Sequence, residues 1–106
     1  MNRNKHPKKK IKGFVMNRKS GHPSFAYHQI DDHVKSIGFT HNKKDKEEKI
    51  LLSKNINPKD TRDCYVKTKI EHQRSRDYRT IKEYSKYRIA TEDAPIIEII
   101  IKQKKR

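Results

Sequence analysis

Histidine and threonine side chains stand at the ends of two short apolar segments of this chain. His22 comes two residues before the segment Ser24–Ile30, and Thr40 and His41 stand where the segment His33–Thr40 ends. Imidazole gives or takes a proton near neutral pH, and hydroxyl groups can stabilise charge on a phosphate oxygen. Metal-independent RNA cleavage needs such groups: a base for the ribose 2′-hydroxyl, a donor to the phosphate and an acid for the leaving 5′ oxygen.

The two apolar segments must lie side by side for these groups to meet. They are rich in strand-forming residues, and the polar pair Asp31–Asp32 between them predicts a hairpin. Pairing around that turn would place Pro23 almost opposite Thr40 and bring His22 near His41, although a shift of one residue would reverse the faces. Pro23 also restricts His22 to extended geometry. Catalytic roles and ordinary strand-end or solvated roles both remain open for these three side chains.

The charge of the chain predicts a polyanionic partner. Its 106 residues include 28 lysines and arginines against 13 acidic residues, a net charge of +15. Such an excess attracts nucleic acid, RNA first and DNA as a possibility, because neutralised phosphates release counterions. The alternative is that the basicity only serves solubility. Residues 1–12 predict a flexible basic arm, and residues 13–106 fit a single small barrel-like domain with a thin core.

The pattern along the domain predicts short strands followed by a helix. The expected strands are Gly13–Met16, Ser24–Ile30, His33–Thr40, Lys49–Ser53 and Asp63–Ile70. For Thr91–Lys104, a capping threonine, acidic residues at the start and lysines at the end favour a helix, whereas its five isoleucines would also suit a buried strand. The fold class is therefore mostly β with a C-terminal helix (α+β), built as a small, antiparallel, partly open barrel or sheet.

A basic and aromatic stretch between these elements is the candidate surface for holding RNA. Arginine binds phosphate in a bidentate manner, and tyrosine rings stack on unpaired bases. The alternative is that the tyrosines pack into the core and the charges are solvated. The stretch 74–87 predicts one short helix or an ordered loop. The candidate nucleic-acid-binding residues are Arg74, Arg76, Tyr78, Arg79, Lys82, Tyr84, Lys86 and Arg88.

Other site types are disfavoured by the residue content. The histidines and carboxylates show no metal-ligand spacing, so neither a metal nor another cofactor is expected. Cys64 is the single cysteine; it suits a buried, inert thiol and a reducing, cytoplasmic location. No signal peptide and no apolar run of membrane-spanning length is recognised, so no membrane association is expected.

The order of segments resembles the PemK/MazF-like family of small endoribonuclease toxins. The resemblance rests on the loop Arg18–Gly21, the run His22–Ala26 and the strand end at Thr40. It implies an SH3-like barrel, a homodimer, single-stranded RNA as substrate and a neutralising antitoxin. It also implies catalysis by a loop arginine and a strand-ending threonine, which Thr40 matches. The family's Arg-Pro is His22-Pro23 here, so the role of the arginine falls to Arg18 or His22. A second likeness is to barnase/RelE-type nucleases, which normally begin with a helix.

The sequence therefore predicts a metal-independent endoribonuclease of the toxin type acting on single-stranded RNA. Its catalytic residues would be His22 as acid or base, His41 as the second proton carrier, and Thr40 and Arg18 as phosphate-holding groups. The alternative is a non-catalytic RNA- or DNA-binding module from a mobile element or a ribosome-associated protein.

Overall fold

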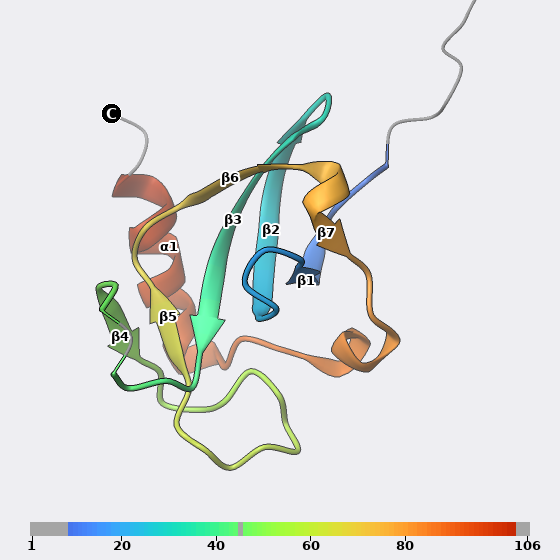
Figure 1. The fold of residues 1–106 in the computed structure, drawn as a ribbon. Helices are drawn as coiled ribbons and strands as arrows, with labels where there is room; N and C mark the ends of the chain where they lie inside the picture. The colour runs from blue at the N-terminus through green and yellow to red at the C-terminus, as the bar shows by residue number, and fades with distance from the viewer. Residues whose placement is uncertain (1–8, 45, 104–106) are drawn as a thin grey trace, which may run out of the picture.

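The fold is an antiparallel sheet with one helix packed against it (Figure 1). The computed structural model describes residues 9–44 and 46–103, so most of the basic arm expected at residues 1–12 lies outside the described residues. The strands are β1 Gly13–Asn17, β2 Pro23–Ile30, β3 His33–Thr40, β4 Lys49–Leu51, β5 Tyr65–Lys67, β6 Glu71–Arg74 and β7 Tyr78–Arg79. The helical elements are the 3₁₀ turns η1 Ser75–Asp77, η2 Lys82–Lys86 and η3 Thr91–Asp93, and the helix α1 Ala94–Gln103.

The strands form one open sheet in the order β4-β5-β3-β2-β1-β7, and β6 also pairs with β3. β3 is the central strand because it pairs with β2 along one edge and with β5 and β6 along the other. This arrangement confirms the mostly antiparallel α+β class. Closure into an SH3-like barrel stays a prediction.

The predicted hairpin of β2 and β3 is confirmed, with its turn at Asp31–Asp32. Ile30 pairs with His33, and Asp31 adopts a positive φ of 53°, which aspartate tolerates better than most residues. The register shifts between Ala26 and His28, which leaves one extra residue on β2 as a bulge. Ser24 lies opposite Gly38, so the start of β2 and the end of β3, which carry the candidate catalytic residues, lie side by side.

The chain between β3 and α1 differs in part from its prediction. The expected strand Asp63–Ile70 is regular only as β5, and the polar strand β6 follows it. The short helix or loop expected over 74–87 is two 3₁₀ turns, η1 and η2, separated by β7. The isoleucine-rich C-terminal segment is helical, which settles the choice between helix and strand.

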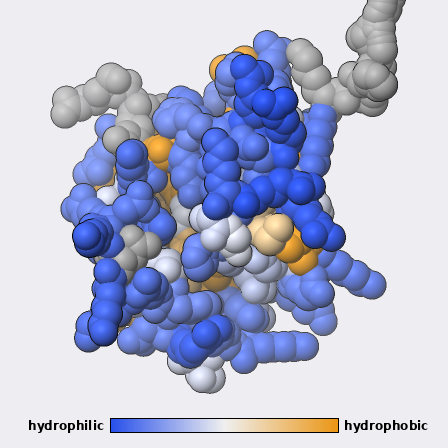
Figure 2. Space-filling model, in the orientation of Figure 1, coloured by the Kyte–Doolittle hydropathy of each residue, from blue (hydrophilic) through white to orange (hydrophobic). Residues whose placement is uncertain are grey.

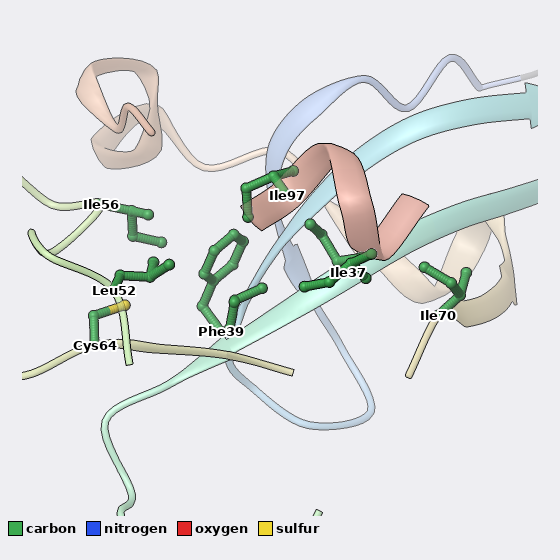
Figure 3. Close-up of a cluster of buried hydrophobic side chains, with 9 residues drawn as sticks. Ile37, Phe39, Leu52, Ile56, Cys64, Ile70 and Ile97 are labelled. Atoms are coloured by element: carbon green, nitrogen blue, oxygen red, sulfur yellow. The ribbon is translucent and has the colours of Figure 1, made fainter. Parts of the chain in front are cut away.

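The main core lies between the sheet and α1. Ile37 and Phe39 of β3, Val66 of β5, and Ile97 and Ile100 of α1 are all buried there. Leu52, Ile56 and Cys64 extend this core into the long loop between β4 and β5, where they lie around Phe39 (Figure 3). A second core on the other side of the sheet contains Ile11, Val15, Ala26, Val34 and Tyr78.

The face shown in Figure 2 is dominated by hydrophilic residues, with only scattered hydrophobic ones. Within the described ranges, no helix combines the length and the apolar character that crossing a bilayer would require.

Candidate functional site

The ends of β2 and β3 and the loop that follows β4 surround one small hollow. Its lining consists of His22, Pro23, Phe39, Thr40, His41, Asn55, Ile56, Asn57, Cys64 and Tyr87. The structure thus brings His22, Thr40 and His41 together, as the predicted hairpin register requires. Because Ile56 and Cys64 are also part of the main core, the wall of the hollow is held by apolar packing.

Asn55 orients the imidazole of His41. The Asn55 amide oxygen accepts a hydrogen bond from the backbone N–H of Asn57 at 2.9 Å, and its nitrogen donates to the carbonyl of Arg62 at 3.0 Å. These two backbone partners fix the direction of the amide. The same Asn55 nitrogen lies 3.1 Å from Nε2 of His41, and an amide nitrogen can only donate. Nε2 therefore accepts, which is the bonding of a neutral imidazole.

A carboxylate and a guanidinium stand beside this histidine. Asp60 Oδ2 lies 3.6 Å from His41 Nε2. Arg62 contacts both carboxylate oxygens of Asp60, with distances of 2.7 Å from Nη2 to Oδ2 and 3.0 Å from Nε to Oδ1. Hydrogen bonds from the side chain and backbone of Arg62 lower the pKa of Asp60 well below its usual range, so Asp60 is an anion. The Arg62 side chain is 69% exposed, so its cation can reach a ligand.

The surroundings of His41 favour its neutral form. Burial lowers the pKa of His41, and the positive charge of Arg62 lowers it further. The Asp60 carboxylate opposes these effects by raising the pKa, and the charge of the nearby His22 lowers it. The result is an imidazole that is ready to accept a proton, with an anion nearby to stabilise the cation that would form.

Two hydroxyl groups complete the wall of the hollow. Thr40 is only 2% exposed, and its Oγ1 accepts a hydrogen bond of 3.0 Å from the backbone N–H of Asn42. The Thr40 hydroxyl can still donate its own proton to another acceptor. Burial raises the pKa of Tyr87 and a side-chain hydrogen bond with Asn57 lowers it, with burial the larger effect, so its phenol stays protonated. The ring of Tyr87 stacks on Tyr84 with centroids 4.4 Å apart.

Arg18 is not among the residues that line the hollow. It lies in the turn between β1 and β2, where its backbone N–H donates to the carbonyl of Asp77 at 2.7 Å. Arg62 does not line the hollow either, but it is the exposed cation beside His41, because it contacts the Asp60 carboxylate next to the imidazole. The charge pattern of the chain did not single it out.

The candidate RNA-holding residues are distributed over several elements. Arg74 and Arg76 line a hollow beside β6, Arg88 lines a different one beside the loop 52–64, and Lys82, Tyr84 and Lys86 belong to η2. Arg79, on β7, is exposed. Tyr78 must be removed from the candidates, because it is fully buried and its hydroxyl lies 2.6 Å from Ser36 Oγ. Burial raises its pKa to about 12.

Sequence reasoning missed Asn55, Asp60 and Arg62 as site residues. Asn55 and Asp60 stand at the two ends of a run of turn-forming residues, 55–60, and they do form turns: the side-chain oxygens of Asn55 and Asp60 each accept a backbone N–H two residues later. The sequence signal that could have identified them is the pair Asp60 and Arg62, two opposite charges that stand two residues apart at the end of this run.

In the described part of the chain, no three histidine, cysteine or acidic side chains come together in a way that could hold a metal ion. Burial raises the pKa of the Cys64 thiol, which fits the expected inert cysteine rather than a nucleophile. Compared with known proteins, the chain matches no family model, no curated protein and no solved structure.

Proposed function

We propose that this protein is a metal-independent endoribonuclease that cleaves single-stranded RNA at the mouth of the small hollow at the ends of β2 and β3. The observation that supports it best is the pair His22 and His41 in one hollow, with the bonding and the surroundings of His41 favouring its neutral form. The net charge of +15 supplies the attraction for the polyanion.

In the proposed reaction His41 acts as the base. A ribose 2′-hydroxyl replaces the amide of Asn55 at Nε2 and gives its proton to the imidazole. The 2′ oxygen then forms a bond to phosphorus. Asp60, an anion 3.6 Å from the same nitrogen, stabilises the imidazolium. This role needs a carboxylate that does not itself take the proton, and the lowered pKa of Asp60 supplies one.

His22 acts as the acid in this proposal. As the bond from phosphorus to the 5′ oxygen breaks, His22 gives a proton to that oxygen. The products are a 2′,3′-cyclic phosphate and a free 5′-hydroxyl. Donors from Thr40 and Tyr87 and the charge of Arg62 stabilise the negative charge that grows on the phosphate oxygens. We thus assign to Arg62 the phosphate-holding role that the sequence suggested for Arg18.

The resemblance to PemK/MazF-like toxins supports the same substrate and extends the proposal. It implies an SH3-like barrel, a homodimer and a neutralising antitoxin, and the single, buried cysteine suits a reducing, cytoplasmic place of action. The substitution of His22-Pro23 for the family's Arg-Pro is consistent with a histidine-based acid in this chain.

The test is cleavage of an end-labelled single-stranded RNA in EDTA by the parent protein and by His22→Ala, His41→Ala and Thr40→Ala. We expect fragments ending in 2′,3′-cyclic phosphate from the parent and a loss of about 10²-fold or more for each histidine variant. The matched control substrate carries one 2′-deoxyribose at the cleavage position and should remain intact there. Circular dichroism checks that the variants fold.

Three results would contradict the proposal. They are cleavage that requires a divalent metal, equal cleavage of the deoxy-substituted substrate, and variants as active as the parent. Salt-sensitive binding of RNA or DNA without any cleavage would instead support the non-catalytic binding module.

A further inference from the structure

A second group of cationic and imidazole side chains lies at the turn end of the β2–β3 hairpin. The register puts His28, Lys35 and His72 in one row across β2, β3 and β6. The next row on the same face contains Ile30, His33 and Arg74. Directly paired residues and residues two apart along a strand share a face of the sheet, so these two rows form one continuous surface.

This surface also has a third contributor, the 3₁₀ turn η1. A single hollow is lined by residues of both rows together with Arg76, Asp77 and Lys19. We call the set His28, His33, Lys35, His72, Arg74 and Arg76 the histidine face. All of its members except the half-buried Lys35 are exposed.

The charge of the hollow is strongly positive. Four lysine and arginine side chains line it, and the one acidic lining residue, Asp77, lies 3.8 Å from Lys19. Asp32 contacts Arg74 through Nη1 at 3.0 Å. An arginine has five N–H donors, so Arg74 keeps donors for a further ligand. The hollow therefore has an excess of cations over anions.

We propose that the histidine face binds the phosphate backbone of single-stranded nucleic acid at a site separate from the cleavage hollow. Lys35 and Thr40 are five residues apart on β3, which is about 17 Å along a strand. An odd spacing also puts the two side chains on opposite faces of the sheet, so the histidine face and the cleavage hollow are separate sites. Binding at this face does not require cleavage.

The side chains of the face suit a nucleic acid better than an anionic lipid surface. Arginine, lysine and histidine all donate hydrogen bonds to phosphate oxygens, and imidazole and guanidinium planes stack on unpaired bases. Insertion into a membrane interface needs a broad apolar face. Ile30, 61% exposed, is the single large apolar side chain in the two rows.

The experiment measures binding of a fluorescent, uncleavable 2′-O-methyl oligonucleotide by anisotropy over a range of salt concentrations. The variants are Lys35→Gln with Arg76→Gln, and His28→Gln with His33→Gln and His72→Gln. Lys102→Gln is the control for the loss of one cation outside the face, since Lys102 lies on α1 and lines a different groove; Lys35→Gln alone is the variant of equal charge to compare with it. Vesicles containing anionic phospholipid form a second arm.

Removal of one phosphate-binding cation from the face should weaken binding about fivefold near 0.1 M salt and lower the salt slope by about 0.7. The Lys35/Arg76 variant should therefore bind about 25-fold more weakly, while the control changes little. The proposal is overturned if the face variants bind like the control, or if the vesicles bind the face as strongly as the oligonucleotide. Because the probe cannot be cleaved, a failed cleavage assay leaves this result intact.

Discussion

At the scale of single residues, the sequence identified the proton-handling groups but not the groups that set their state. His22, Thr40 and His41 were found from residue type and hairpin register, and the structure places them around one hollow. Asn55 and Asp60 were not found, because their side chains look the same in a turn whether or not they also face a histidine. The second role depends on how the loop 52–64 packs, which local sequence does not reveal.

Removal of Asp60 and removal of Arg62, the two charged neighbours of His41, should shift the pH dependence of catalysis in opposite directions. Because its pKa is lowered, His41 stays neutral at pH values somewhat below the ordinary pKa of histidine. Base catalysis should therefore continue in mildly acidic solution and fall as the pH drops through the pKa of His41. Asp60 raises this pKa and Arg62 lowers it. Asp60→Asn should therefore move the acid limb of the pH–kcat/KM profile to lower pH, and Arg62→Ala should move it to higher pH.

The profiles of the two variants are compared with those of the parent and of Lys102→Ala, which removes a remote charge. Both variants should also lose rate at their optimum, since one removes the anion that stabilises the imidazolium and the other removes the phosphate-holding cation. Limbs that shift in the same direction, or that do not shift at all, would show that His41 is not the base.

At the scale of elements, the two strands of the hairpin were predicted closely, the segment Asp63–Ile70 is a strand only over Tyr65–Lys67, and the polar strand β6 was missed. The bounds of β3 match the prediction, and β2 differs only by its first residue. β6 has the sequence Glu-His-Gln-Arg, with no apolar residue to give an alternating pattern. It is a strand because its backbone pairs with β3, and such pairing is not visible in local sequence.

A close approach between β3 and β6 explains the glycine at position 38. Ser24 and Ser36 both donate hydrogen bonds to Oε1 of Glu71, at 2.8 and 2.6 Å. This holds the carboxylate over Gly38, where an added Cβ would lie 2.7 Å from Oε2. Gly38→Ala should therefore destabilise the fold by about 1–3 kcal/mol, the usual cost of overpacking.

The double variant Gly38→Ala with Glu71→Ala separates this steric effect from others. It should be more stable than the sum of the single variants predicts, because the atom that the new methyl group meets has been removed. Denaturant unfolding of the parent, both single variants and the double variant measures the coupling. Strictly additive free energies of unfolding would show that the glycine is there for another reason.

At the scale of the whole molecule, composition predicted a highly charged surface, and the face in Figure 2 is dominated by hydrophilic residues. The main core depends on packing between residues that are distant in sequence, such as Leu52 and Ile56 of a loop against Phe39 of β3. The same long-range packing buries Tyr78 of the basic stretch 74–88. Charge content can predict that a polyanion is attracted, but only the fold shows which cations share a face.

The central position of β3 has a consequence for the timing of local opening. β3 is bordered by paired strands on both of its edges, whereas the loop that carries Asn55 and Asp60 is held mainly by turns and by its packing against the core. Amide protons in β3 should exchange with deuterated water most slowly, and those of residues 55–63 much faster. Exchange followed by mass spectrometry should then show slow exchange for β3, which carries Thr40, and faster exchange for the loop on the other side of the hollow. The loop would thus open locally more often than the whole molecule unfolds.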